Sequence, residues 1–232
     1  MIIGISGKIG SGKDTIGEII QGLSITNGGR EFEIKKYAGK LKTIASLLTG
    51  IPVEDFELQD FKKTLLGEEW GTVRPNPLNA VPVFENVQFN HLMSVREFLQ
   101  KLGTEAMRDG LHTNVWVNAL FADYKAIVTE PAKFGGTAIG EYPNWIITDM
   151  RFPNEMEAVE LREGITIRVV RGCSECGGIG YHKLSCSKQY EKQHPSETSL
   201  DDAEFDYEII NDGSVDDLIA KVRQILITEK II

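Results

Sequence analysis

The first fifteen residues of the chain place the strongest constraint on what it can fold into. Met1 to Ser6 is a short, mostly aliphatic run that predicts a buried strand. Gly7 to Lys13 follows with the spacing G-x-x-x-x-G-K, and apolar residues then recur at helical spacing, at Ile16, Ile19, Ile20 and Leu23. A strand, a glycine-rich loop and a helix in this order are what a P-loop requires. The sequence therefore predicts an α/β fold with a phosphate site near its amino terminus.

The chemistry of this loop suits a phosphorylated ligand. Glycines at positions 7, 10 and 12 let the backbone curl so that successive N–H groups face inward, with no Cβ in the way of a phosphate. A helix that opens near Lys13 presents unpaired N–H groups and the positive end of its dipole. We therefore predict that Gly10, Gly12 and Lys13 bind phosphates, with the Lys13 ammonium as a mobile charge on the outer ones. The alternative is a glycine-rich turn that holds no ligand.

The position after the lysine departs from the usual pattern. A Ser or Thr normally follows the lysine and binds Mg²⁺, whereas here Asp14 follows and Thr15 comes one residue later. Either Asp14 reaches the metal, directly or through water, or Thr15 serves in a shifted register. The sequence leaves both open.

Composition and charge narrow the class of protein. The 232 residues fit one domain, or one domain with an insertion, and the hydrophobic content of 41% allows a core of useful size. A net charge of −9 argues against broad binding to polymeric nucleic acid. We see no signal peptide and no apolar run of the ~20 residues that span a membrane. Three cysteines do not form a secreted disulfide framework, so we expect a cytoplasmic protein.

Strands and helices are predicted to alternate along the rest of the chain. The predicted strands cover residues 31–37, 144–150, 165–170 and 206–210, and the predicted helices cover 40–48, 94–102, 114–128, 154–162 and 214–226. This alternation indicates a parallel sheet with helices on both faces. Residues 67–91 are rich in proline and asparagine and predict a flap or an insertion of unknown role.

Several charged residues fall where a phosphate site could use them. Lys35 and Lys36 lie where the predicted strand at 31–37 meets the helix that follows, and they either contact phosphate or form part of a solvated lysine-rich face. Arg96, Arg151 and Arg171 each lie at or beside the end of an element, and an arginine can bind phosphate with two parallel hydrogen bonds. Signalling GTPases carry D-x-x-G after a strand, but here that spacing occurs only at Asp14–Gly17, within the phosphate loop and the first helix. Their N-K-x-D string is absent, and the strand at 144–150 does not end in Asp-Glu. Transfer to a bound acceptor is therefore favoured over hydrolysis.

The chain resembles the bacteriophage-type deoxynucleoside monophosphate kinases. The resemblance depends on an ordered set of segments rather than on any single motif beyond the phosphate loop. The set comprises Gly7–Thr15, Ala38-Gly39, Ser94–Thr104, Trp116-Val, Phe121–Tyr124, Thr148–Arg151 with Glu155, and Ile210–Ser214. An aspartate after the P-loop lysine is expected in this family.

The resemblance implies an adenylate-kinase-like fold, and ATP- and Mg²⁺-dependent phosphorylation of deoxynucleoside 5′-monophosphates. The implied ATP site is Gly10, Gly12, Lys13, Asp14 and Thr15, and the implied acceptor site is Arg96, Gly103, Thr104, Trp116, Arg151 and Glu155. Asp149 would join Asp14 and Thr15 in supporting Mg²⁺ or its water shell. Lys13, Arg96 and Arg151 are the predicted catalytic residues. A homodimer is left open.

Each of these assignments has a simpler alternative. Trp116 could be a packing residue instead of a wall for the base or sugar. Arg96 could be an exposed helix arginine, and Arg151 could pair with Glu155. Asp149 could cap the helix that follows it.

The three cysteines lie close together in a segment rich in glycine and serine. Cys173, Cys176, His182 and Cys186 give C-x₂-C-x₅-H-x₃-C, which suits tetrahedral Zn²⁺, with His194 as a substitute ligand. Three free thiols in a loop are the alternative. We predict one P-loop kinase domain over residues 1–232, with a lid-like insertion at 172–194.

Two other functions remain open from the sequence. One is a P-loop kinase for another small acceptor, such as dephospho-coenzyme A. The other is a protein that binds nucleotide without turnover.

Overall fold

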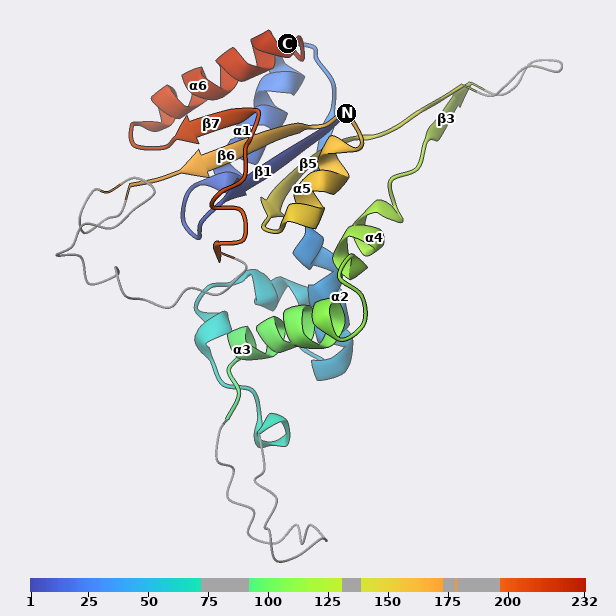
Figure 1. Cartoon of the computed structure of the whole chain (residues 1–232), viewed down its shortest axis with the longest axis vertical. Helices are drawn as coiled ribbons and strands as arrows, with labels where there is room; N and C mark the ends of the chain where they lie inside the picture. Colours follow the sequence, from blue (N-terminus) through green and yellow to red (C-terminus); the bar gives the residue numbers. More distant parts are fainter. Residues whose placement is uncertain (72–91, 131–138, 173–177, 179–196) are drawn as a thin grey trace, which may run out of the picture. The chain divides into compact units, whose positions relative to one another are not determined.

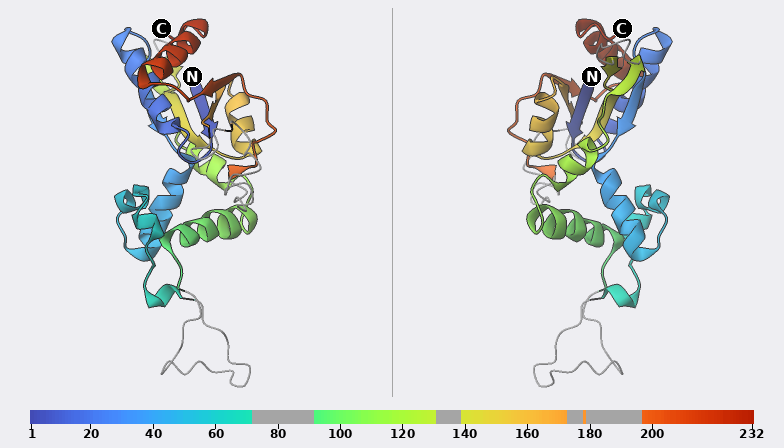
Figure 2. Two further views of the ribbon diagram at one scale, coloured as in Figure 1. Left: turned by 90° about the vertical axis from the view of Figure 1, so that its left-hand side faces the viewer. Right: turned by 90° about the vertical axis from the view of Figure 1, so that its right-hand side faces the viewer.

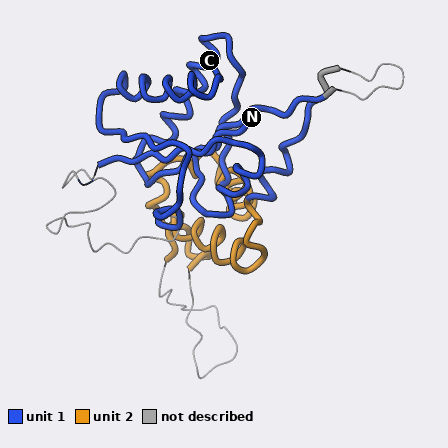
Figure 3. The backbone as a smooth tube through the Cα atoms, turned by 45° about the horizontal axis from the view of Figure 1, so that its top comes forward, with its two compact units in different colours: residues 1–37, 117–232 blue, residues 38–116 orange. Residues whose placement is uncertain are grey.

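The computed structural model describes residues 1–71, 92–130, 139–172, 178 and 197–232. The chain divides into two compact units, which Figure 3 colours separately. Unit 1 comprises residues 1–37 and 117–232, and unit 2 comprises residues 38–116.

Unit 1 is built on a five-stranded parallel sheet in the order β2-β5-β1-β6-β7 (Figure 1). Its strands are β1 (Ile2–Gly7), β2 (Phe32–Lys35), β5 (Asn144–Met150), β6 (Ile165–Val170) and β7 (Tyr207–Ile210). Every neighbouring pair in this sheet runs parallel. The predicted parallel sheet is therefore confirmed. Ligands in such sheets collect at the carboxyl ends of the strands, where β1 delivers the glycine-rich loop and β5 delivers Asp149 and Arg151.

Helices cover both faces of this sheet, as predicted (Figure 2). Helices α1 (Lys13–Thr26) and α6 (Val215–Thr228) pack on one face, and α5 (Pro153–Glu160) packs on the other. The α1/α6 face holds the main core, whose buried side chains include Ile3, Ile5, Ile16, Ile20, Ile146, Ile167, Leu218 and Val222. The central strand β1 is buried over its first five residues, which explains its continuous apolar run.

Helix α6 shows how local sequence sets the ends of an element. Ser214 accepts a hydrogen bond from the Asp217 backbone N–H at 3.2 Å, and Asp217 accepts in return from the Ser214 N–H at 2.9 Å. This reciprocal pair satisfies two of the N–H groups that the first helical turn leaves without partners. Leu218, Val222, Ile225 and Leu226 then fall on the buried side of the helix.

The face of the sheet opposite α1 and α6 carries an aromatic cluster. Trp145 of β5 stacks on Phe121 with ring centroids 6.1 Å apart, and it meets Tyr124 edge to face at 4.8 Å. The Arg162 guanidinium lies 3.8 Å from the centroid of the Phe121 ring. Aromatic pairs of this geometry add to the stabilisation that their buried area already provides.

Unit 2 is formed by short helices around a small core of its own. It contains α2 (Tyr37–Thr49), of which Tyr37 belongs to unit 1, the 3₁₀ turns η1 (Val53–Glu57), η2 (Phe61–Lys63) and η3 (Glu68–Trp70), and α3 (Val95–Gln100). The core consists of Ala45, Phe56, Leu66, Val95 and Phe98. The buried Lys42 ammonium pairs with Glu57 at 2.5 Å, which compensates a charge that burial would otherwise leave costly.

The predicted helix over residues 94–102 takes an unexpected form. Ser94 caps α3 by accepting the Glu97 N–H at 3.2 Å. Beyond Gln100 the chain continues as a π-helix, η4 (Lys101–Asp109), instead of ending or breaking at Gly103 and Thr104. Turns of π-helix occur frequently at functional sites. The spacing of apolar residues in the sequence does not indicate this change from α-helical to π-helical hydrogen bonds.

The predicted helix over residues 114–128 is wrong in its second half. Helix α4 (Val115–Phe121) ends after seven residues, Tyr124 lies in a turn, and residues 127–130 form the strand β3 (Ile127–Glu130). β3 pairs antiparallel with β4 (Ile139–Glu141), which lies between the elements predicted from the sequence. The β-branched run Ile127-Val128-Thr129 favours a strand, and it outweighs the apolar spacing that suggested a longer helix.

The start of β7 is fixed by a compact group of hydrogen bonds. Asp206 Oδ2 accepts from both the backbone N–H and the hydroxyl of Thr166, each at 2.8 Å, and Thr166 is 1% exposed. The Thr166 hydroxyl accepts in turn from the Asp206 N–H at 3.0 Å. Asp206 therefore holds the beginning of β7 against β6.

Replacing Asp206 with alanine is expected to lower the free energy of unfolding by about 1–2 kcal/mol. The change leaves two donors of the buried Thr166 without their acceptor, and an unsatisfied buried donor is costly. Urea unfolding followed by circular dichroism would measure the change. Asp202→Ala is the control, because Asp202 is an exposed aspartate four residues earlier, and its loss should have no measurable effect. Equal stability of the two variants would contradict this role for Asp206.

None of the helices that the structure describes is long and apolar enough to cross a membrane.

Candidate active site

The glycine-rich loop has the backbone geometry of a phosphate site. Gly10 and Gly12 have φ angles of +75° and +101°, which side chains with a Cβ rarely adopt. Helix α1 begins at Lys13, and Gly12 at its N-cap has no side chain to cap it. The first N–H groups of this fourteen-residue helix are therefore available to an anion.

A buried hydroxyl inside the loop supports the same interpretation. Ser11 is 3% exposed, and its Oγ has no hydrogen-bond partner among the described residues. Buried polar atoms are usually satisfied, and one that is not requires an explanation such as a water or a ligand. The loop thus fits the phosphates of a nucleotide both in its backbone and in its chemistry.

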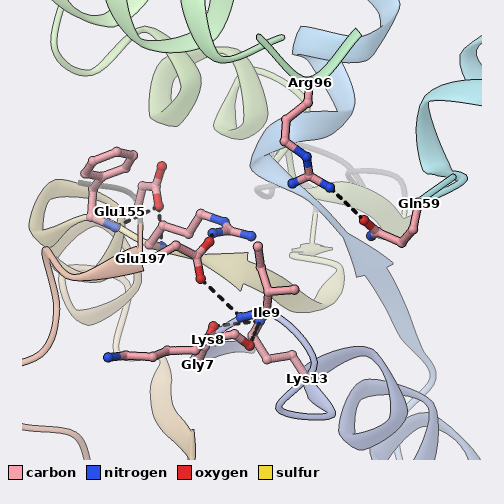
Figure 4. Close-up of polar contacts among 10 residues, drawn as sticks. Gly7, Lys8, Ile9, Lys13, Gln59, Arg96, Glu155 and Glu197 are labelled. Atoms are coloured by element: carbon pink, nitrogen blue, oxygen red, sulfur yellow. Dashed lines mark hydrogen bonds and ion pairs between the residues drawn. The ribbon is translucent and has the colours of Figure 1, made fainter. Parts of the chain in front are cut away.

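The Lys13 side chain lies folded over the loop (Figure 4). Its ammonium donates to the carbonyl oxygens of Gly7 at 2.6 Å and Lys8 at 2.8 Å. Burial lowers the pKa of Lys13, and the nearby Arg151 lowers it further, while Glu197, Asp14 and Asp149 act in the opposite direction. The ammonium is thus only partly solvated and lies among several charged groups, where a phosphate would stabilise its charge.

Asp14 is held at the start of α1 by two donors. Its Oδ1 accepts from the Thr148 hydroxyl at 2.8 Å and pairs with the Lys36 ammonium at 3.0 Å. Burial acts to raise the pKa of Asp14, but the hydrogen bonds from Lys36 and Thr148 outweigh it, so the pKa is lowered. Asp14 is therefore a carboxylate at neutral pH, while Thr15 beside it is exposed.

The two lysines of the second strand have different surroundings. Lys36 lies against Asp14, next to the phosphate loop. Lys35 pairs with Glu33 at 2.6 Å and lies 5.1 Å from the centre of the Trp145 ring. Of the two predicted phosphate contacts, Lys36 is the one that the fold brings to the loop.

Asp149 and Glu155 both accept backbone N–H groups at helix starts. Asp149 Oδ1 accepts from the Tyr37 N–H at 2.8 Å, which begins α2, so Asp149 caps an earlier helix than the one that follows it. Glu155 is 3% exposed, and its Oε2 accepts from the N–H groups of Arg151 at 2.7 Å and Phe152 at 3.0 Å. Glu155 thereby fixes the backbone that carries Arg151.

A carboxylate that the sequence did not single out bridges Arg151 and the phosphate loop. Glu197 pairs with the Arg151 guanidinium through Oε1, and its Oε2 accepts from the Ile9 N–H at 3.1 Å (Figure 4). The two oxygens of one carboxylate thus contact an amide of the loop and an arginine. Since a phosphate oxygen accepts from the same kinds of donor, these two donors are spaced to share one anion.

Two further residues hold the loop from neighbouring strands. Asn211, just after β7, donates from its side-chain amide to the Ser11 carbonyl at 2.8 Å. Arg171, just after β6, donates to the Gly10 carbonyl at 3.3 Å. Arg171 is one of the arginines predicted from the sequence to lie near a phosphate, whereas the sequence predicts no role for Asn211. No local pattern indicates these pairings, which join residues 161 and 200 positions apart.

The remaining predicted site residues belong to unit 2. Trp116 is 7% exposed, and its indole N–H donates to the Gly103 carbonyl at 2.8 Å. Two of the predicted acceptor-site residues are therefore in direct contact. A Cβ at Gly103 would lie 2.9 Å from Leu41 Cδ2, which explains a glycine within η4. Packing accounts for these contacts. Arg96 donates to Gln59 Oε1 at 3.2 Å (Figure 4). The roles of Arg96, Gly103, Thr104 and Trp116 toward an acceptor remain predictions.

The predicted zinc ligands Cys173, Cys176, His182 and Cys186, together with His194, lie outside the described residues. So does the predicted lid at 172–194, apart from Gly172 and Gly178. Both remain predictions.

A parallel sheet with a phosphate loop after its first strand, followed by a helix, defines a P-loop protein. Comparison with known proteins narrows this class. The sequence model of the family described as "Deoxynucleotide monophosphate kinase" matches residues 73–222, which is more than half of the chain. The chain belongs to this family.

A similar protein of known name carries the same description as the family. The chain is 26% identical over 137 residues to a protein of Escherichia phage RB69 named "Deoxynucleotide monophosphate kinase". The alignment covers 59% of this chain and 46% of the relative, so the chain spans about half the length of the protein it matches. The family match begins after the phosphate loop, so the assignment of that loop depends on its own geometry.

Proposed function

We propose that the protein phosphorylates deoxynucleoside 5′-monophosphates to diphosphates with ATP as donor. The observation that carries the proposal is the combination of the phosphate loop with membership of the deoxynucleotide monophosphate kinase family. The loop supplies the donor site, and the family supplies the acceptor class. A kinase for another small acceptor and a binding protein without turnover are both less consistent with that membership.

The proposed donor site is the loop from Gly7 to Thr15. The N–H groups of the loop and of the first turn of α1 bind the ATP phosphates, and the Lys13 ammonium exchanges the carbonyls of Gly7 and Lys8 for the outer phosphates. Both of those bonds are to neutral acceptors. A phosphate is a stronger partner for the ammonium because its oxygens are charged.

In this proposal Arg151 lies where the migrating phosphoryl group passes. Its guanidinium shares the anion Glu197 with the Ile9 amide of the loop, so an anionic group bound at that amide is within reach of the arginine. Glu155 positions Arg151 through the backbone. Arg96 is proposed to hold the acceptor phosphate, a role that depends on the resemblance and on the bidentate chemistry of arginine.

Mg²⁺ would be held by oxygen ligands from Asp14, Thr15 and Asp149. Oxygen donors of this kind are what Mg²⁺ prefers. Burial acts to raise the pKa of Asp14, but the hydrogen bonds from Lys36 and Thr148 lower it overall and so favour the carboxylate form. When bound, the ion neutralises phosphate charge. Thr148 ties Asp14 to β5, so a carboxylate from α1 and one from β5 approach the same end of the sheet.

The proposal is tested by incubating the full chain with Mg²⁺ and ATP plus each of four deoxynucleoside monophosphates and four ribonucleoside monophosphates. Diphosphate formation is measured by chromatography, with ATP alone as the blank. We expect ADP and a deoxynucleoside diphosphate in equal amounts with at least one deoxynucleotide. Dephospho-coenzyme A as a ninth acceptor tests the rival kinase. ATP binding without ADP release in any reaction would support the binding protein instead.

A further inference from the structure

Asn211 is fixed in space by the sheet and reaches the phosphate loop with its side chain. Strand β7 ends at Ile210, and the Asn211 N–H donates to the Val170 carbonyl at 2.8 Å, which extends the pairing of β7 with β6 by one residue. From this position the side-chain amide donates to the Ser11 carbonyl at 2.8 Å. The backbone of Asn211 is therefore anchored independently of the contact that its side chain makes.

The contact with Ser11 sets the direction of a loop N–H group. The peptide bond between Ser11 and Gly12 is trans, so the carbonyl of Ser11 and the N–H of Gly12 point in opposite directions. Because the carbonyl points at Asn211, the N–H of Gly12 points away from it. The Gly12 carbonyl, on the next peptide, accepts from the Ile16 N–H at 3.0 Å and belongs to the first turn of α1. This part of the loop is thus held on both sides of Gly12.

The loop leaves space for Asn211 only because residue 12 is glycine. A Cβ at Gly12 would lie 2.5 Å from Asn211 Nδ2, closer than any such contact can be. The φ of +101° at Gly12 independently requires glycine. The Asn211 side chain therefore packs directly against the backbone of Gly12, although the two residues are far apart in the sequence.

We propose that Asn211 is a positioning residue that presets the phosphate loop for a triphosphate. It holds the Ser11–Gly12 peptide in the orientation that presents an amide to the ligand, so the loop does not have to be ordered when the ligand binds. This role of Asn211 rests on the proposed function, because it assumes that the loop binds a nucleoside triphosphate. Without Asn211 the same peptide can rotate, and part of the binding free energy is used to order it.

The test compares binding of inorganic tripolyphosphate and of Mg²⁺–ATP to the native chain, Asn211→Ala and Asp212→Ala by isothermal titration calorimetry. Asp212 belongs to the same turn, and its carboxylate pairs with Lys221 of α6 at 3.2 Å, so its loss is the matched control. We expect Asn211→Ala to weaken the binding of both ligands on the order of tenfold. The reason is that the variant loses one hydrogen bond that orders the loop before the ligand binds. Asp212→Ala should bind within twofold of the native chain.

Thermal unfolding of the ligand-free variants separates positioning from a purely structural role. If Asn211 only supported the turn before α6, Asn211→Ala would melt earlier and bind tripolyphosphate with native affinity, and that result overturns the proposal. An equal loss of affinity in Asp212→Ala also overturns it. If Asn211→Ala does not fold, Asn211→Asp decides, because it keeps the size, removes the donor and should weaken binding at least as much.

The acceptor experiment distinguishes this inference from the proposed function. A native chain that binds tripolyphosphate, loses affinity in Asn211→Ala and phosphorylates no deoxynucleotide supports the role of Asn211 and overturns the proposed acceptor. A native chain that binds neither tripolyphosphate nor ATP overturns both.

Discussion

Replacing Lys13 with alanine is expected to lower turnover by on the order of 10²-fold or more. The Lys13 ammonium lies at the start of α1 and is held over the loop by its hydrogen bonds to the carbonyls of Gly7 and Lys8. A fixed charge at a position where negative charge moves in the transition state typically contributes this much. Phosphoryl transfer depends on such stabilisation because the protein does little covalent chemistry in it. Steady-state assay of ADP release with the best deoxynucleotide acceptor would measure the loss.

Lys8→Ala is the matched control for this substitution. Lys8 belongs to the same loop and carries the same charge, but its ammonium pairs with Asp201 at 3.4 Å on the exposed surface. Removing it changes the net charge of the chain by the same amount without taking a cation from the loop interior. We expect turnover within a few-fold of native for Lys8→Ala, because exposed ion pairs contribute little. Near-native turnover in Lys13→Ala, or an equal loss in both variants, would contradict the assignment of Lys13.

The parts of the fold that the sequence predicts well are those defined by local periodicity. Strand β1, the loop and helix α1 follow from one continuous pattern, and α6 follows from a capped apolar stripe. Strands β5 and β6 are apolar because parallel strands are buried on both faces. The carboxyl ends of β1 and β5 could therefore be predicted to carry the site, with Asp149 and Arg151 at its edge.

The parts that could not be predicted depend on register or on distant pairing. The π-helix η4 keeps the apolar residues of a helix and changes only its hydrogen bonds. Helix α4 ends at Phe121 although the apolar spacing continues. Glu197 meets Ile9 across 188 residues, and Asn211 meets Ser11 across 200. Nothing in the neighbourhood of a glutamate or an asparagine indicates which distant amide or carbonyl it will contact.

The second large expected effect comes from substitutions in the ion pair between Arg151 and Glu197. Replacing Arg151 is expected to impair activity, whereas replacing Glu197 is expected to strengthen ATP binding. The planar Arg151 guanidinium can donate two parallel hydrogen bonds to an anion, and in the structure it pairs with the Glu197 carboxylate. Glu197 also accepts a hydrogen bond from the backbone N–H of Ile9 in the phosphate loop, at 3.1 Å. A phosphate bound at that amide must displace this carboxylate. Under the proposed function Arg151 serves the reaction, whereas Glu197 competes with the ligand.

Arg151→Ala is accordingly expected to lower turnover by on the order of 10²-fold, since it removes the charge that we propose stabilises the migrating phosphoryl group. Glu197→Gln breaks the same ion pair from its other side and leaves the guanidinium in place, so it is the matched control. We expect it to retain turnover and to bind ATP more tightly, by several-fold, because a neutral amide is a weaker competitor for the Ile9 N–H than a carboxylate. Parallel measurement of turnover and of the ATP dissociation constant in both variants gives the comparison. If the pair were only structural, both variants would lose turnover and stability together, and the role of Arg151 in catalysis would have to be abandoned.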